Sequence, residues 1–350
     1  MQEQIMPYPP KQPSGKDGKK RPGAVVILLA IIALLLAVII ALLYKGSSQE
    51  PAVAQAPAVA ETPAQSDKRN TAPQDDAWVA RLNAWADEFQ IPEKDLPRDK
   101  AALLALQNLD LDRYKSPLPK ITWLPAEIGQ LQQLQKLYLS GNQLTALPAE
   151  IGQLQQLQIL YLWGNQLSTL PPEIGQLQQL QILWLGGNQL SSLPAEIGQL
   201  QQLQKLDLNG NQLSSLPAEI GQLQQLQQLY LDDNQLSSLP AEISQLRQLQ
   251  QLWLGKNQLS TLPAEIGQLR QLRVLNFGGN QLSTLPPEIG QLRQLQILYL
   301  SYNQFSSLPA EITQLRHLKF LNIRDNPKLR LTPVQEQFLQ GVKRVEGFQQ

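Results

Sequence analysis

Residues 201–243 read QQLQKLDLNGNQLSSLPAEIGQLQQLQQLYLDDNQLSSLPAEI and contain nearly the same unit twice. The stretch NQLSSLPAEI at 211–220 returns unchanged, 23 residues later, at 234–243. In contrast, KLDLNG at 205–210 becomes QLYLDD at 228–233. A chain that copies some positions and varies others is built from one structural unit. The constant positions therefore predict a scaffold, and the variable positions predict a surface that the scaffold presents.

The same frame runs through most of the chain. Nine units of 23 residues occupy 124–330, and Leu106, Leu109 and Leu111 fit a tenth, degenerate unit upstream. The nine units begin at Leu124, Leu147, Leu170, Leu193, Leu216, Leu239, Leu262, Leu285 and Leu308. Repeats of this length predict a solenoid in which each unit contacts its neighbours, with atypical end units that cover the exposed core.

The leucines of each unit predict one strand and one helical turn. In LQKLYL, at 134–139, apolar and polar residues alternate as they do in a short strand. In LPAEIGQL, at 124–131, a proline followed two residues later by a glutamate is a helix-start signal, and the apolar residues continue at helical spacing. Each element has one apolar side, which only stacking on neighbouring units can bury.

One asparagine per unit follows the predicted strand. These residues are Asn142, Asn165, Asn188, Asn211, Asn234, Asn257, Asn280, Asn303 and Asn326. A polar side chain beside a leucine core must satisfy its hydrogen bonds, and the amide can bond the free backbone groups of the turn where the chain leaves the sheet. We therefore expect this asparagine ladder to be structural.

The pattern LxxLxLxxNxL, present as LQKLYLSGNQL at 134–144 and followed by LPAEIGQL, resembles the leucine-rich repeat superfamily. It is most similar to the 23-residue class of bacterial and Ras-suppressor-like proteins. The resemblance implies an α/β solenoid, a curved array with a concave parallel β-sheet and short helical turns on its convex side. The family is a binding scaffold without a shared chemistry, so the fold alone names no ligand.

The variable positions lie on the predicted strands. Because side chains alternate along a strand, Leu137 and Leu139 are predicted to point inward, and Lys136, Tyr138 and Ser140 toward solvent on the concave side. The nine units hold 11 aromatic residues, and nine of them fall in these columns and the position that follows them. Tyr and Trp gathered on a varying surface are typical of an interaction face.

This concave face supplies the predicted ligand-binding residues. They are Tyr138, Tyr161, Trp163, Trp184, Asp207, Tyr230, Asp232, Trp253, Tyr299, Tyr302 and Phe320. The alternative is that neighbouring rings only stack along the sheet and stabilise it, which predicts an uninterrupted aromatic column. The column of Tyr138 is broken by Asp207, Asn276 and Asn322, which favours the binding face.

Two charged features allow further interpretations. Asp207, Asp232 and Asp233 could bind calcium or a basic partner, although Asp233 and Lys256 share a column in adjacent units and are expected to pair. An arginine column could bind phosphate or lipid headgroups, but a solvated flank beside the glutamates of each unit is the simpler interpretation. Its members are Arg247, Arg270, Arg293 and Arg316.

Composition argues against several function classes. With 29 basic and 29 acidic residues the net charge is zero, so no charge argument for nucleic-acid binding exists. The chain has no cysteine and a single histidine, His317, which removes disulfides, thiolate chemistry and histidine-ligated zinc. No phosphate-binding loop or hydrolase motif is present. We expect no enzyme activity, no cofactor and no metal site.

The N-terminal part predicts a membrane anchor. Residues 24–43 are only Ala, Val, Ile and Leu, enough for a helix about 30 Å long, which spans a bilayer. Five basic residues precede this stretch and only Lys45 closely follows it, so the N-terminus is predicted to be cytoplasmic and the repeats extracytoplasmic. The absence of cysteines and of glycosylation sequons points to the periplasm of a Gram-negative bacterium.

The ends of the repeats are predicted to be caps. Val334, Phe338, Val342 and Val345 are spaced as one helical face. The predicted organisation is a cytoplasmic tail (1–23), a transmembrane helix (24–44), a Pro/Ala-rich linker (45–74), a helical cap with a degenerate repeat (75–123), nine repeats (124–330) and a C-terminal cap helix (331–350).

Together these features predict a membrane-anchored scaffold that binds a protein partner with its concave face. The alternative is binding of cell-wall or other glycans, because Tyr and Trp side chains stack on sugar rings. A purely structural membrane spacer is the third interpretation.

Overall fold

The computed structural model describes residues 76–347. The predicted membrane segment 24–44 and linker 45–74 lie outside this range. Within 76–347, no helix is both long enough and apolar enough to cross a bilayer.

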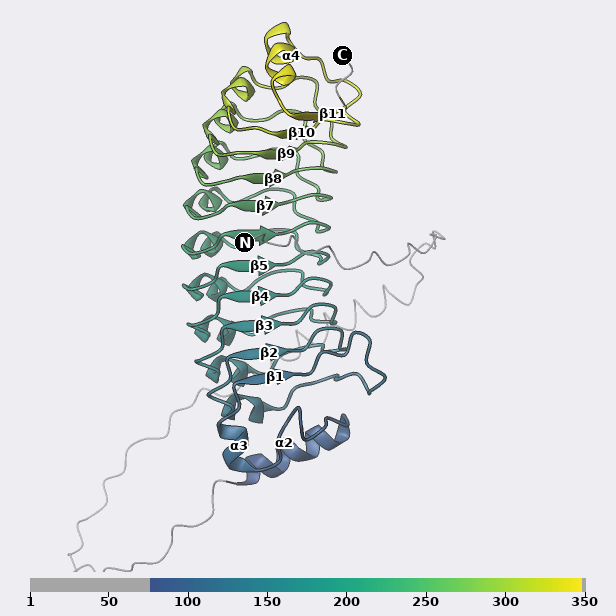
Figure 1. Ribbon diagram of the computed structural model, residues 1–350, viewed down its shortest axis with the longest axis vertical. Helices are drawn as coiled ribbons and strands as arrows, with labels where there is room; N and C mark the ends of the chain where they lie inside the picture. The colour runs from purple at the N-terminus through teal and green to yellow at the C-terminus, as the bar shows by residue number, and fades with distance from the viewer. Residues whose placement is uncertain (1–75, 348–350) are drawn as a thin grey trace, which may run out of the picture. The chain divides into compact units, whose positions relative to one another are not determined.

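The repeats form a single parallel sheet of 11 strands in sequence order, β1 to β11 (Figure 1). Adjacent strands pair one unit apart, as Leu160 does with Leu137 on one side and Leu183 on the other. The strands are β1 Asn108–Asp110, β2 Lys136–Tyr138, β3 Ile159–Tyr161, β4 Ile182–Trp184, β5 Lys205–Asp207, β6 Gln228–Tyr230, β7 Gln251–Trp253, β8 Val274–Asn276, β9 Ile297–Tyr299, β10 Phe320–Asn322 and β11 Arg344–Glu346. The strand that the leucine pattern predicts in each unit is confirmed, and so is the parallel sheet that the resemblance implies.

Each unit also has one 3-10 helix, on the side of the array away from the sheet (Figure 1). These helices are η1 Ala126–Gln130, η2 Ala149–Gln153, η3 Pro172–Gln176, η4 Ala195–Gln199, η5 Ala218–Gln222, η6 Ala241–Gln245, η7 Ala264–Gln268, η8 Pro287–Gln291 and η9 Ala310–Gln314. They pack closely on one another, because a Cβ added to Gly198 in η4 would lie 2.5 Å from the carbonyl oxygen of Glu219 in η5. Glycine occupies this position in seven of the nine helices, and Ser244 and Thr313 occupy it in η6 and η9.

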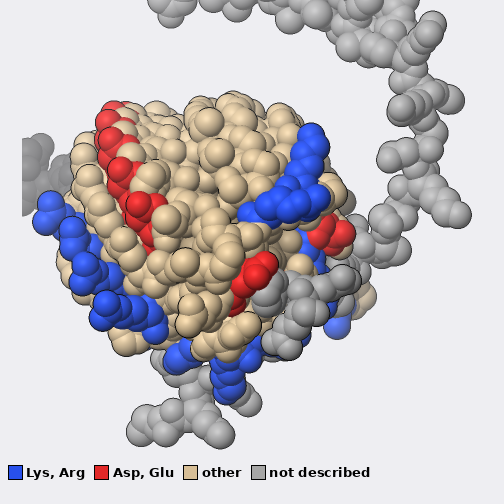
Figure 2. All heavy atoms as spheres, turned by 90° about the horizontal axis from the view of Figure 1, so that it is seen from above, with Lys and Arg blue, Asp and Glu red and all other residues tan. Residues whose placement is uncertain are grey.

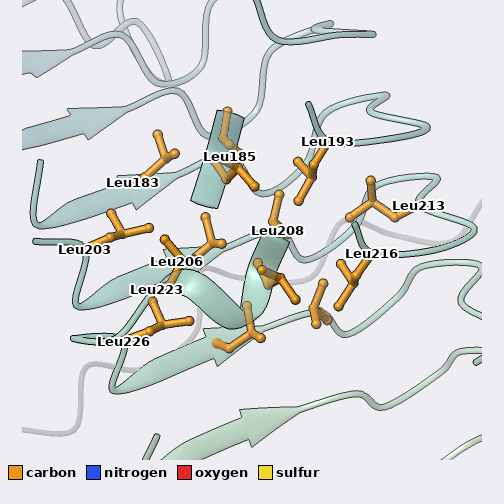
Figure 3. Close-up of a cluster of buried hydrophobic side chains, with 14 of the residues drawn as sticks. Leu183, Leu185, Leu193, Leu203, Leu206, Leu208, Leu213, Leu216, Leu223 and Leu226 are labelled. Atoms are coloured by element: carbon orange, nitrogen blue, oxygen red, sulfur yellow. The ribbon is translucent and has the colours of Figure 1, made fainter. Parts of the chain in front are cut away.

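Leucines fill the space between the sheet and the 3-10 helices. Figure 3 shows leucine side chains of successive units pointing toward one another, among them Leu183 and Leu206 from the strands. Both residues are fully buried, as is Leu223, which follows η5. The core is continuous from one unit to the next, so each unit buries its apolar surface against both neighbours.

The asparagine ladder runs beside this core. Asn211, which is 7% exposed, donates from Nδ2 to the carbonyl oxygens of Leu185 and Leu208, each at 3.0 Å. Its Oδ1 accepts from the backbone N–H of Leu190, also at 3.0 Å. Two of these bonds reach the preceding unit and one stays in the same unit. Each asparagine therefore fixes a turn and joins two units.

The N-terminal end is covered by helices α2 (Ala77–Glu88) and α3 (Lys100–Leu104). Helix α2 buries Trp78, Leu82 and Trp85 against the first unit. The indole N–H of Trp85 donates to the carbonyl oxygen of Trp123 at 3.0 Å, which fixes the helix to the chain that enters the first repeat.

The C-terminal end departs from the predicted cap helix. Helix α4 covers only Pro333–Gln340, and the chain then forms β11, which pairs with β10. The predicted helical face is therefore wrong, because Val345 is in the strand and Val334 is 66% exposed. The open edge of β10 offers backbone hydrogen bonds that an extended segment can satisfy and a longer helix could not.

Candidate functional site: the outer face of the sheet

The outward side chains of the strands form one face, called the sheet face below. Lys136 and Tyr138 on β2 are half-buried on this face, whereas Leu137 between them is fully buried. The strand pairing places Tyr161 beside Tyr138 and Trp184 beside Tyr161. Residues that are 23 positions apart in sequence are therefore neighbours in space.

Two groups of rings stack along this face. In the first ladder, the Tyr138 and Tyr161 centroids are 5.0 Å apart, and Tyr161 and Trp184 stack at 4.1 Å with an interplanar angle of 4°. The predicted stacking of neighbouring rings thus does occur, and it does not by itself distinguish binding from stabilisation.

The second ladder begins on β6, two strands after the end of the first. Tyr230 and Trp253 lie 6.3 Å apart, and Tyr299 and Phe320 lie 5.1 Å apart. Trp253 and Tyr299 are 5.9 Å apart although β8, with Asn276, lies between their strands. The rings therefore close over Asn276, so this asparagine interrupts the sequence column but not the ladder.

Asp207 separates the two ladders. It pairs with Trp184 on one side and Tyr230 on the other, in the middle of the sheet. Its Oδ1 accepts from the backbone N–H of Asn209 at 2.9 Å. Burial between the aromatic rings raises the pKa of the Asp207 carboxyl from 3.8 to about 6, because the charged form loses water contact. Burial also raises the pKa of Tyr230, and the negative charge of Asp207 adds to this effect.

A row of polar side chains lies beside the ladders. Asp232 accepts from the backbone N–H of Gly255, and its Oδ1 is 3.3 Å from Asn276 Nδ2. The backbone N–H of Asp232 donates to Asn209 Oδ1 at 2.7 Å. Asp232 is thus tied into the sheet face by three strands. Across 76–347 no group of three or more acidic or histidine side chains is placed to hold a metal ion.

The turn that follows each strand contains one residue with a left-handed backbone conformation, at position 141 and at every 23rd position after it. Glycine occupies this position in five units, whereas Asp233, Lys256, Tyr302 and Asp325 adopt it with φ between 53° and 56°. The expected pair forms here, with Lys256 Nζ 3.0 Å from Asp233 Oδ2. Tyr302 is 65% exposed and lies in the turn, away from the rings of the second ladder. A tyrosine in a conformation that favours glycine costs about 1–2 kcal/mol, which marks this position as one selected for its side chain.

One aromatic residue of the sheet face was missed by the sequence pattern. Tyr114 belongs to the insertion in the degenerate unit and is 43% exposed, and its ring is 5.3 Å from that of Trp163. The only sequence feature that could have indicated Tyr114 is the presence of an aromatic residue in an inserted segment. Nearby, a polar pocket of about 210 Å³ is lined by Asp95, Asp110, Leu111, Asp112, Arg113, Ser116 and Leu118.

Charged side chains on the rest of the surface gather in rows. Seen along the stack, one row of acidic and one row of basic side chains run side by side (Figure 2). The 3-10 helices contribute one half-buried glutamate each, from Glu127 to Glu311, and the turns after η6 to η9 contribute the exposed arginine column. These four arginines form no ion pair with another part of the chain that the structure describes, so the row of positive charge faces solvent.

Comparison with known proteins identifies the architecture. A family model described as a leucine-rich repeat region matches residues 93–187, 172–278 and 263–337. The chain belongs to the leucine-rich repeat family. No curated protein sequence matches this leucine-rich repeat chain.

Solved leucine-rich repeat structures are similar to it over the repeats. The ectodomain of the plant membrane receptor kinase GASSHO1/SCHENGEN3 from Arabidopsis thaliana is 34% identical, with a TM-score of 0.57 over 64% of this chain and 28% of that one. A TDR receptor is 26% identical, with a TM-score of 0.51 over 65% and 48% of the two chains. The functional domain of InlJ from Listeria monocytogenes is 22% identical, with a TM-score of 0.54 over 70% and 54%, which shows the fold alone. The match therefore spans 28% to 54% of the length of these three proteins.

The buried charge of Asp207 in this leucine-rich repeat sheet predicts a pH-dependent stability. Because the folded-state pKa of Asp207 is raised to about 6 from 3.8, its ionisation opposes folding above pH 6, and this effect disappears as the pH falls toward 4. We expect Asp207→Asn to raise the free energy of unfolding by about 1–2 kcal/mol at pH 7.5 and to have little effect at pH 4. Urea unfolding of both proteins at the two pH values measures this difference.

The exposed Asp325 provides the control for this comparison, because Asp325→Asn should change stability little at either pH. A stability difference between Asp207→Asn and the parent protein that is the same at both pH values would contradict the assigned burial of the charge.

Proposed function

We propose that this chain is a binding scaffold that recognises a protein partner with the sheet face of its leucine-rich repeats. The observation that carries the proposal is the arrangement of the variable residues. The core leucines and the asparagine ladder repeat almost unchanged, whereas the outward positions collect two aromatic ladders with a carboxylate between them. Tyr and Trp side chains supply large contact areas with few rotatable bonds, which suits protein recognition.

Two of the similar structures support a protein or peptide partner. Both are receptors, and the plant receptor kinase ectodomain was solved in complex with CASPARIAN STRIP INTEGRITY FACTOR 2. The 23-residue period, with LQKLYLSGNQL at 134–144 as its pattern, supports the finer proposal that these repeats belong to the class of bacterial and Ras-suppressor-like proteins.

Site-specific photocrosslinking of the full chain in cells tests the binding face. Benzoylphenylalanine at Tyr161 reports on the sheet face, and the same group at the exposed Gln179, in the turn after η3, is the matched control. We expect adducts of defined mass that contain a second polypeptide, identified by mass spectrometry, from position 161 and none from position 179. Adducts that lysozyme removes would instead support the glycan alternative. The same adducts from both positions would contradict recognition by the sheet face.

We also propose that residues 24–44 anchor the chain in a membrane with the repeats on the extracytoplasmic side. The purely aliphatic segment and the basic residues before it support this topology. Because the chain has no cysteine, a single cysteine at Ser66 or Ser14 reports the side of the membrane. In cells with a permeabilised outer membrane, an impermeant maleimide should label position 66 and spare position 14. The opposite result would place the repeats in the cytoplasm.

A further inference from the structure

Asp207 occupies the gap between the two aromatic ladders, and this gap is a candidate binding site of its own. Trp184 and Tyr230 belong to strands on either side of β5, so their backbones are about 9–10 Å apart, two strand spacings. Within 76–347, Trp184 contacts the ring of Tyr161 and Tyr230 contacts the ring of Trp253. Trp184 and Tyr230 make no ring contact with each other. Trp184 ends the first ladder and Tyr230 begins the second, one on each side of Asp207.

A third aromatic side chain, Trp163, lies near this position and follows β3 in the chain. Gly186 has no side chain, and a Cβ added there would lie 2.8 Å from Trp163 Cδ1 and 3.2 Å from Asp207 Oδ1. The indole of Trp163 and the carboxylate of Asp207 thus lie over the same glycine. The Asp207 carboxylate therefore has Trp184 and Tyr230 on the two neighbouring strands and Trp163 close by.

No basic side chain neutralises that carboxylate. Among the residues that the structure describes, Asp207 accepts one backbone hydrogen bond, from Asn209, and it makes no ion pair. Lys205 lies two residues earlier on the same strand but forms no salt bridge with it. The next strand, β6, brings the neutral side chain of Tyr230 beside Asp207.

We propose that the Asp207 site binds one basic side chain, a lysine or an arginine, of an extended polypeptide partner. The cation would lie between the rings of Trp184 and Tyr230 and pair with the Asp207 carboxylate. This inference rests on the proposed protein-binding function and names the chemistry that the partner must present.

A cation bound here would offset the cost of burying the charge of Asp207, and it would also contact the aromatic rings beside that carboxylate. A half-buried carboxylate without a partner is costly, and an ion pair in this setting is screened less than one at the surface. Aromatic faces attract Lys and Arg by cation–π interaction, and guanidinium groups also stack on rings. A neutral sugar would leave the charge of Asp207 unpaired, and a calcium ion would need more oxygen ligands than this site supplies.

Fluorine NMR of the full chain in detergent, labelled with 5-fluorotryptophan, tests the proposal. The protein has six tryptophans, and Trp184→Phe assigns the resonance that reports on the site. The probes are the blocked peptides Gly-Gly-Arg-Gly-Gly and Gly-Gly-citrulline-Gly-Gly, which differ by one charge at nearly constant shape. We expect the arginine peptide to shift the Trp184 resonance saturably at up to about 20 mM, and the citrulline peptide to leave it unchanged.

Two variants complete the experiment. Asp207→Asn should weaken arginine-peptide binding about tenfold or more, whereas Asp325→Asn, which removes an exposed charge at the edge of the sheet, should not. Binding should also weaken below pH 6, because the raised pKa of Asp207 makes it neutral there. Tyr230, beside Asp207, is neutral at these pH values. The other charged side chains on the adjoining chain segments are Lys205, on the same strand, and Asp232, which follows β6.

Equal shifts with the citrulline peptide, unchanged affinity in Asp207→Asn, or no saturable shift with the arginine peptide would each overturn the proposal. A shift of Trp184 by chitotriose and not by the arginine peptide would overturn it in favour of a sugar site. Crosslinking from position 161 distinguishes failure of the Asp207 proposal from failure of the proposed protein-binding function. Adducts to a protein that persist in Asp207→Asn would leave the binding face intact and remove only the basic-side-chain site.

Discussion

Asn211→Ala is expected to lower the free energy of unfolding by about 2–4 kcal/mol. The side chain is buried, and it makes four hydrogen bonds to the backbone of two units. Alanine removes these bonds and leaves the buried N–H of Leu190 without a partner, whereas the carbonyl oxygens of Leu185 and Leu208 each keep one bond, from Asn188 and Asn234. A buried group without a partner costs about 1–3 kcal/mol, and the lost hydrogen bonds add to this cost. Urea unfolding followed by circular dichroism measures the change.

The matched control is Gln212→Ala, one residue further along the chain. Gln212 is exposed, and it is the backbone N–H of this residue that donates to the carbonyl oxygen of Leu190. Its replacement should therefore change stability by less than about 0.5 kcal/mol. Similar losses in the two variants would show that the asparagine side chain does not hold the turn in the way described.

Trp85→Ala is expected to lower the free energy of unfolding by a similar amount, but the loss should be concentrated at the N-terminal end of the array. Trp85 in α2 is 2% exposed, contacts the ring of Phe89 and donates to the carbonyl oxygen of Trp123. Truncating a buried tryptophan to alanine typically costs about 3–5 kcal/mol. In a stacked array each unit is stabilised by contacts with the units next to it. The cap and the first units should therefore open while distant units stay closed.

Hydrogen exchange measured by mass spectrometry resolves this distribution. Amides in β2 and β3 should exchange faster in Trp85→Ala, whereas those in β8 and β9 should keep their protection. Trp184→Ala, on the sheet face, is the control and should cost less, because Trp184 is only half-buried. Uniform loss of protection along all strands in Trp85→Ala would argue against a local role of the cap.

The leucine spacing was sufficient to predict the strands, because a residue that must be buried in every unit leaves a period that is visible in one sequence. The pairing of Asp233 with Lys256 followed from the same register. The ladder contacts were not predictable in this way. Whether Trp253 and Tyr299 meet over Asn276 depends on side-chain rotamers, which alternating patterns do not specify.

The ends of the array were the least predictable part. The strand Arg344–Glu346 has no apolar run of its own, and it forms because β10 has a free edge. The sequence around Tyr114 departs from the repeat, so its contact with Trp163 required the structure. Similarly, Tyr302 adopts a positive φ at a position that glycine occupies in five other units. These features depend on tertiary context rather than on the local sequence.

The equivalence of the contacts between units has a genetic consequence. Because Asn188, Asn211 and Asn234 make the same bonds to the unit before them, recombination between repeats can remove one whole unit and leave every remaining junction intact. Loss of the unit that carries Asp207 would place Trp184 next to Tyr230 and merge the two ladders into one. A single in-frame deletion could thus change what the surface recognises without passing through a misfolded intermediate. In such a lineage, the number of repeats becomes a heritable variable on which selection for a partner can act.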